Sequence, residues 1–320
     1  MLNVSRWISI LVLAGFGAVA VAAEGDLMDT EYLHQPNAGT FELTPGLGGA
    51  PGNTALLNQP NGIILRNYNI SGSDTKFNLF LVPIMVSADY GISSMFSIGA
   101  SLTYGSGATG FSNCPSGGTC NSHTIKGLFD PELYFKGRAA IGPGVLQYGV
   151  VAEVGVEKSK TDSSGDGNWA TGGTTLSPFI AYQLPVGTGA LGARFKYDLY
   201  KGDRKSTSQT SSASIDSTTS NGNAVSVDAF YEIPVGIVTL GGALIYSSYP
   251  ETKTASGNNY AKADKNANSI FGLQFYAPVH LSGVTLLPNV AYQSYSFSSS
   301  DSGFSSVNAL QLGIAARLTF

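Results

Sequence analysis

Apolar and polar residues alternate along much of this chain, and a helical repeat is rare by comparison. The clearest alternation covers residues 145–157, 190–200 and 224–233, where one face of each segment is apolar and the opposite face is charged. The charged faces carry Glu153 and Glu157 in the first segment, Arg194, Lys196 and Asp198 in the second, and Asp228 and Glu232 in the third. This pattern predicts β-strands between an apolar environment and a polar space.

The length of these segments separates two kinds of β-protein. A soluble β-sandwich buries one face of each strand too, but its strands are about 5 to 6 residues long. The alternating segments here extend over about 10 to 15 residues, which is the length of tilted strands that cross a membrane. We therefore expect a transmembrane β-barrel.

The connections between these segments give an independent indication of a barrel, because short and long connections alternate along the chain. Short connections are expected at 91–94, 139–144, 185–189, 234–236 and 278–283, and long ones rich in Ser, Thr, Asn and Gly at 106–122, 158–172, 201–223, 250–268 and 299–305. Outer-membrane barrels have short periplasmic turns and long extracellular loops. Two packed sheets have no reason to sort their connections in this way.

The same pattern predicts an all-β fold, a single antiparallel transmembrane barrel of about twelve strands that covers residues 62–320. The expected strands lie near 62–71, 75–90, 95–105, 123–138, 145–157, 173–184, 190–200, 224–233, 237–249, 269–277, 284–297 and 306–320. An even number of strands is the rule in bacterial barrels. An even number of strands places both termini on the same side of the membrane, here the periplasm.

Both ends of the chain carry export features. Arg6 precedes an apolar stretch that closes on Ala20-Val21-Ala22, the small-residue pattern of a signal-peptide cleavage site, so we expect residues 1–22 to be removed. The last strand carries one apolar row that ends on an aromatic residue: Leu310, Leu312, Ile314, Ala316, Leu318 and Phe320. Aromatic residues line the membrane interfaces of such barrels. This ending resembles the C-terminal signal of bacterial outer-membrane proteins, which implies the barrel-assembly machinery as a partner and the outer membrane as the location.

Residues 23–61 fit the pattern least well. The stretch "TFELTPGLGG" within them is compatible with an extra strand, a periplasmic arm or a segment that plugs the lumen. These alternatives matter because a plugged lumen and an open one imply different functions.

Composition agrees with a membrane environment and excludes several other classes. Charged residues make up only 12% of the chain, about half the usual share of a soluble domain, and the chain contains 40 glycines. A net charge of −4 without a basic cluster argues against nucleic-acid binding. We expect membrane lipids and small solutes as partners instead.

The chain offers little material for a metal site, a cofactor or catalysis. Cys114 and Cys120 lie close together in an exported chain, and we expect them to form a disulfide. The three histidines are His34, His123 and His280, and they do not have the spacing of zinc ligands. The dinucleotide-like "GTGALG" at 187–192 lies in a turn between strands, and "DSSGDGN" at 162–168 lacks the closing Glu of a calcium loop. We therefore expect no cofactor and no enzyme activity.

The charged faces suggest a lumen lined with residues of both signs. On residues 124–138, one face is expected to carry Lys126, Asp130, Glu132, Lys136 and Arg138, next to Glu153 and Glu157 on the following strand. Oppositely charged residues on paired strands interact across the ladder. These groups either line a permeation path or fill the interior, and the sequence leaves both interpretations open.

Two stretches resemble a known family. "ADYGISSMFSIGASLTYG" at 88–105 and "GLFDPELYFKGR" at 127–138 are similar to the transporter-like outer-membrane family named for the meta-pathway of phenol degradation. The chain keeps the family's Tyr90-Gly91, Gly127, Asp130, Lys136 and Arg138, and it departs from it at Phe129 and Gly137. The resemblance implies uptake of small, often aromatic or hydrophobic compounds.

Taken together, these features predict an outer-membrane channel for passive or facilitated uptake of small solutes. The first alternative is a non-conducting barrel that acts structurally or through its surface loops. The second is a lipid-modifying enzyme, for which His123 near the outer rim is the candidate histidine.

Overall fold

The computed structural model describes residues 30–57, 60–70, 76–112, 122–200, 204–209, 214–220, 223–249, 253–256, 259–260, 268–297 and 304–320. The predicted signal peptide and the expected disulfide between Cys114 and Cys120 lie outside these residues. Within them, no helix is both long and apolar enough to cross a membrane.

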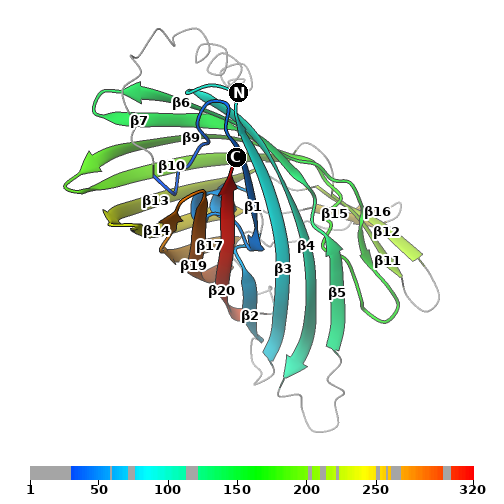
Figure 1. Ribbon diagram of the computed structural model, residues 1–320. Coiled ribbons are helices and arrows are strands. Elements are labelled where there is room, and N and C mark those ends of the chain that lie inside the picture. The colour runs from blue at the N-terminus through cyan, green and yellow to red at the C-terminus, as the bar shows by residue number, and fades with distance from the viewer. Residues whose placement is uncertain are drawn as a thin grey trace.

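Long antiparallel strands form one closed wall (Figure 1). They are β2 (Ile63–Ile70), β3 (Lys76–Gly91), β4 (Phe96–Ser112), β5 (Ser122–Leu128), β6 (Glu132–Ile141), β7 (Gly144–Glu153), β9 (Thr175–Val186), β10 (Gly189–Tyr200), β13 (Ala224–Val235), β14 (Val238–Tyr249), β17 (Asn268–Tyr276), β19 (Val284–Phe297) and β20 (Phe304–Thr319). The short strand β18 (Val279–Leu281) pairs with β19 and lies in the connection between β17 and β19.

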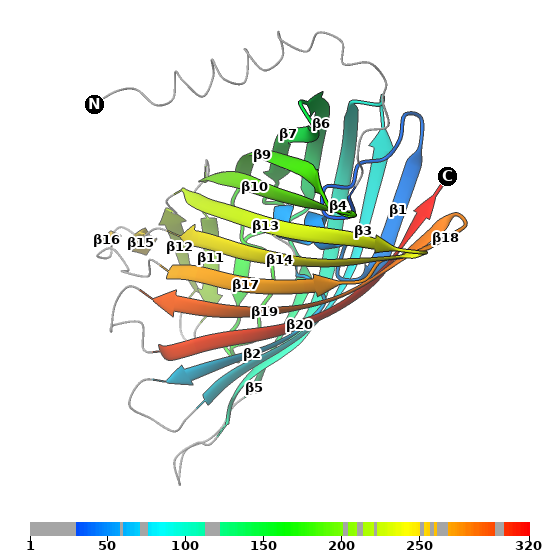
Figure 2. The same ribbon diagram turned by 90° about the vertical axis from the view of Figure 1, so that its left-hand side faces the viewer.

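The wall closes because β20 pairs with β19 on one side and with β2 on the other. Figure 2 shows β13, β14, β17, β19, β20 and β2 side by side in the order of their pairing. Since β5 and β6 both pair with β4 at successive levels, they share one strand position, and the predicted twelve-stranded barrel is confirmed.

The two faces of the wall differ as the alternation requires. Outward side chains such as Ile84, Leu133 and Ile314 are 58%, 55% and 53% exposed, an apolar surface that only a lipid environment suits. Inward side chains such as Arg194 and Asp228 are 3% exposed. The inside of this barrel is therefore packed at their level.

One strand position is interrupted by a loop into the interior. The strand β1 (Phe41–Leu47) pairs with β20 and β3 near the end of the barrel that carries the short turns, and β2 pairs with the same two strands further along. Between them the chain leaves the wall and forms the short helix α2 (Pro51–Leu56). Gly48 and Gly62, with φ of 93° and 109°, meet where the chain leaves and returns, because a Cβ on Gly48 would lie 2.5 Å from the backbone nitrogen of Gly62. The wall thus begins at residue 41.

A second interruption separates β5 from β6. Gly127 adopts a φ of 145°, and residues 129–131 lie outside both strands, although the Phe129 N–H still donates to the carbonyl of Thr103 on β4. On β5 the exposed residues are the even-numbered ones, whereas on β6 the even-numbered residues are the buried ones. The break therefore inverts the alternation that the sequence predicts to continue through 123–138.

The long connections are more ordered than their composition predicts. A second sheet beyond the wall contains β8 (Ser159–Thr161), β11 (Arg204–Gln209), β12 (Ser214–Ser220), β15 (Lys253–Ser256) and β16 (Asn259–Tyr260). Figure 2 shows it at the end of the barrel opposite the C-terminus. The sequence analysis treats these segments as solvated loops. The Thr residues in these loops favour extended backbone, and the fold places the loops next to one another so that they pair.

Candidate functional site in the barrel lumen

Two parts of the N-terminal segment lie inside the barrel, and we call them the plug: residues 30–36 and residues 48–57. Their partners come from widely separated wall strands. Thr30 Oγ1 donates to Gln183 on β9, Gln147 on β7 donates to the carbonyl of Leu33, and Gln274 on β17 reaches the carbonyl of Pro51. Contacts to so many sides of the wall place the plug across the lumen.

Glu232 on β13 holds the first part of the plug by its backbone. Its two carboxylate oxygens accept the backbone N–H of Glu31 at 2.9 Å and that of Tyr32 at 2.7 Å, and one also accepts the hydroxyl of Tyr276 at 2.9 Å. The Tyr32 ring stacks on Phe230 with 4.5 Å between centroids. Because Tyr32 is 1% exposed, this part of the plug is packed like a protein core.

An ionic cluster ties the same part of the plug to the end of the barrel. Arg317 Nη2 lies 2.9 Å from Glu31 Oε1, and His34 Nε2 lies 2.7 Å from Glu42 Oε2. His280 Nδ1 lies 3.8 Å from Glu31 Oε1. Burial would raise the pKa of the Glu31 carboxyl, but Arg317 and the nearby histidines outweigh it, so the pKa lies below the ordinary value. Glu31 is therefore held as a carboxylate.

The second part of the plug is held by cations that bind its carbonyls. Arg194 donates to the carbonyl of Gly52 at 2.9 Å and pairs with Asp228 at 2.5 Å, and Lys196 donates to the carbonyl of Leu56 at 3.2 Å. Leu56 is the last residue of α2, and the carbonyls at the C-terminal end of a helix attract cations such as Lys196.

Lys136 joins the two parts of the plug, donating to the Asn53 side chain at 2.7 Å and to the His34 carbonyl at 3.3 Å.

Apolar contacts complete the packing around α2. Leu56 and Leu57 are 1% and 0% exposed and contact a cluster on four wall strands: Met85, Tyr134, Val151 and Phe179. Burying two leucine side chains favours this arrangement by about 3 to 6 kcal/mol. The plug therefore fills the lumen with both polar and apolar contacts.

Most of the charged residues singled out from the sequence are buried in the described structure: Asp130, Glu132, Lys136, Arg138, Glu153, Arg194, Lys196, Asp198, Asp228 and Glu232. Arg138 donates to the Ser94 carbonyl at 2.8 Å. Asp130 and Glu153 share the hydroxyl of Thr171, which belongs to the connection that follows β7.

Two residues lie elsewhere, and their predicted lumen position is corrected. Lys126 is exposed and pairs with the outward-facing Ser106, because the break after Gly127 inverts the alternation. Glu157 lies beyond the end of β7 and pairs with Lys160 on the surface. The alternation that placed Glu157 inside stops at Glu153, where the strand ends.

Sequence reasoning missed several lumen residues. Arg317 faces inward opposite the apolar row of the last strand, so alternation alone would have found it. Glu31 and Glu42 belong to a segment without clear periodicity, and no sequence signal marks their partners. Arg66 on β2 was also overlooked because it is a single charge in a short strand.

The lumen beyond α2, toward the long connections, is more open. The inward side chains Arg66, Tyr68, Gln293 and Tyr295 are partly exposed there. Ile64, Leu81 and Ala309 form a buried cluster against which Phe129, Trp169 and Tyr295 pack, and the Trp169 and Phe129 rings are stacked 5.3 Å apart. We call this region the outer vestibule.

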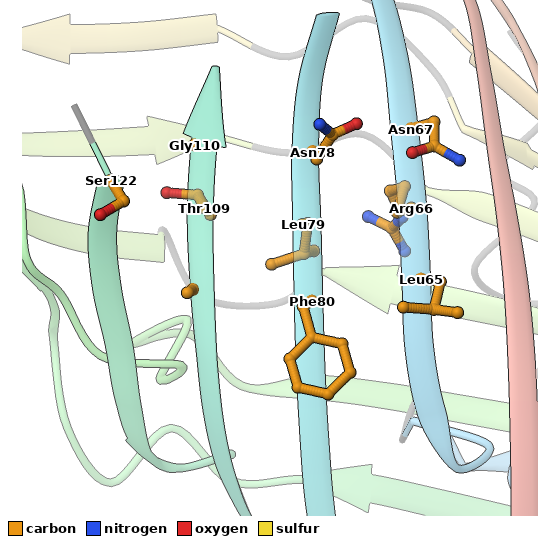
Figure 3. A pocket seen from close by; sticks show the side chains of 10 residues that line it. Leu65, Arg66, Asn67, Asn78, Leu79, Phe80, Thr109, Gly110 and Ser122 are labelled. Atoms are coloured by element: carbon orange, nitrogen blue, oxygen red, sulfur yellow. The ribbon is translucent and has the colours of Figure 1, made fainter. Parts of the chain in front are cut away.

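A separate groove lies over strands β2 to β5 (Figure 3). The volume of the groove is about 310 Å³. Leu65 and Phe80, which line it, are 42% and 46% exposed. These two side chains belong to the outward face of the wall, whereas Arg66 and Leu79, which also line the groove, belong to its inward face.

The described residues contain no group of three or more His, Cys, Asp or Glu side chains suited to a metal ion.

Comparison with known proteins supports the fold. No protein-family model and no curated protein matches the sequence. An outer membrane channel from Pseudomonas putida matches with a TM-score of 0.62 at 12% identity, over 94% of this chain and 100% of that one. The transport unit of the autotransporter AIDA-I from Escherichia coli matches with a TM-score of 0.52 at 12% identity, over 92% of this chain and 94% of that one. The chain thus has the fold of a bacterial outer-membrane β-barrel.

Proposed function

We propose that this protein is an outer-membrane channel that admits small, apolar or aromatic solutes when the plug shifts. In a purely structural barrel, the side chains of the wall itself would fill the lumen. Here a separate segment of the chain, the plug, occupies the lumen, and this observation supports the proposal. The resemblance of residues 88–105 and 127–138 to a transporter-like family and the similarity in fold to an outer membrane channel agree with this proposal. No catalytic step is part of it.

The wall is shaped to admit that segment. Gly192 on β10 and Gly99 on β4 face inward, where a Cβ would lie 2.3 Å from the rings of Phe230 and Tyr134 respectively. These glycines let aromatic side chains lie flat against the wall and leave the centre to the plug. A lumen with this room becomes a passage if the plug moves.

Planar-bilayer conductance tests the proposal. We expect small or infrequent currents from the native protein and currents several-fold larger after deletion of residues 30–36. Deletion of Ser163 and Ser164, which are exposed in the connection between β8 and β9, serves as a control and leaves the native currents unchanged. Absence of current in both the native protein and the plug deletion would reject the channel.

The outer sheet favours a second candidate, a barrel that acts through its surface. The strands β8, β11, β12, β15 and β16 project an ordered five-stranded sheet beyond the wall. If the plug deletion stays non-conducting while the protein retains its fold, this candidate gains over the channel.

A further inference from the structure

Arg66 differs from three other inward-facing cations of this barrel. Arg194, Lys196 and Arg317 each lie within 4.0 Å of a carboxylate. In the described part of the chain Arg66 forms no such ion pair. It donates from Nη1 to the hydroxyl of Tyr68 at 3.2 Å, and its guanidinium lies over the Tyr295 ring at 4.9 Å from the centroid. Among the described residues, its positive charge therefore has no carboxylate partner within 4.0 Å.

A small residue on β20 sets the position of the Arg66 side chain, because β20 lies between β2, which carries Arg66, and β19, which carries Tyr295. Arg66 on β2 and Gln293 on β19 both pair with Ala309 of β20. Since Ala309 has only a methyl group, the arginine side chain passes over it toward Tyr295. The Nε–H of Arg66 is buried and has no hydrogen-bond partner in the part of the chain that the structure describes. A buried donor without a partner costs about 1 to 3 kcal/mol, which a bound acceptor would recover.

The surroundings of Arg66 are apolar and aromatic. Tyr295, which stacks with Arg66, also packs against the cluster of Ile64, Leu81 and Ala309, as do Phe129 and Trp169. Arg66 and these aromatic side chains are partly exposed within the outer vestibule. A site with one charged group at the edge of an apolar surface suits a ligand with one charge and an apolar body.

From this geometry we propose that the outer vestibule binds an apolar molecule that carries one carboxylate. The carboxylate pairs with the planar fork of Arg66, and the apolar body lies against Leu81, Phe129 and Trp169. A guanidinium binds a planar carboxylate through two parallel N–H donors, and for this reason we expect the charged group of the ligand to be a carboxylate. The inference rests on the proposed function and names its solute class. Because it concerns binding, its test does not require transport across the membrane.

Calorimetry with matched ligands tests the site. The protein is purified from outer membranes, placed in lipid nanodiscs and titrated with 4-phenylbutyrate and with the uncharged 4-phenyl-1-butanol. We expect the acid to bind more tightly than the alcohol. Arg66→Gln should weaken binding of the acid by about 10- to 100-fold and leave binding of the alcohol unchanged. Lys126→Gln removes an exposed cation from a nearby strand and should behave like the native protein.

Two outcomes would overturn the inference: equal affinity of the native protein for acid and alcohol, or unchanged affinity for the acid in Arg66→Gln. If that variant does not fold, as judged by its gel migration before and after boiling, Arg66→Lys replaces it. Because Lys keeps the charge without the fork, intermediate affinity supports the site and unchanged affinity rejects it. A native protein that conducts but does not distinguish the ligands rejects this site and leaves the channel intact.

Discussion

Replacing Glu232 with alanine should release the first part of the plug while leaving the wall in place. Glu232 accepts the backbone N–H groups of Glu31 and Tyr32, and these groups have no strand partner. Each buried N–H without an acceptor costs about 1 to 3 kcal/mol, so the two cost about 2 to 6 kcal/mol. Water that enters the space left by the side chain offsets part of this cost. We therefore expect the plugged state to lose about 2 kcal/mol, the low end of this range, which is about a 30-fold increase in opening.

Hydrogen exchange measured by mass spectrometry checks this value. The amides of residues 30–36 should exchange about 30-fold faster in Glu232→Ala, while peptides from β3 and β10 keep their native rates. Glu157→Ala, which removes an exposed carboxylate outside the lumen, is the matched control and should have no effect on residues 30–36. Native exchange at residues 30–36 in a folded Glu232→Ala barrel would refute the idea that this carboxylate anchors the plug.

Three further predictions concern pH, wall continuity and assembly. Because Arg317 keeps the pKa of Glu31 below its ordinary value, ionised Glu31 stabilises the plugged state fully above the ordinary glutamate pKa and ceases to do so as the pH falls. The conductance of the native protein should thus rise below about pH 4. The conductance of Glu31→Gln should exceed that of the native protein at neutral pH and should not show this rise. Gly62→Val should abolish the folded, heat-modifiable gel band, because a Cβ there would lie 2.1 Å from the carbonyl oxygen of Leu312; a native-like band would contradict the role of this glycine. Phe320→Ala should lower the amount of barrel assembled in cells several-fold if the assembly machinery recognises this residue, and unchanged surface yield would exclude that role.

Much of the wall follows from alternation because the environments on its two sides differ so strongly. On β10 and β13, every charge predicted to face inward is buried, and Arg194 reaches Asp228 on the paired strand. A register shift by one residue would turn these charges toward lipid, so the pattern determines the register. The number of strands follows from the same signal together with the alternation of short and long connections.

Alternation fails where the backbone departs from the ladder. Lys126 is exposed because Gly127 and the residues after it break the strand, and a continuous reading of the pattern has no means to detect that inversion. The plug is unpredictable for a related reason. The wall residues from β6 onward that hydrogen-bond to it are 83 to 286 residues away, such as Lys136 for Asn53 and Arg317 for Glu31, and no local period sets its position.

The two parts of the plug are connected to the wall differently, and under the proposed function this difference determines which of them would move. Residues 48–57 leave the wall after β1 and return at β2, so they remain in the lumen unless one of these strands separates from β20. Within the described chain, residues 30–36 join the wall only through β1, at the end with the short turns. Under the proposed function, we expect them to swing out about that connection once Glu232 and Arg317 release them. Opening would leave Leu56 and Leu57 in place beside the passage, so that a solute entering through the outer vestibule would pass these two apolar side chains. Such a path conducts ions and also offers the apolar body of a solute a contact that hydrated ions cannot use, in agreement with the proposed solute class.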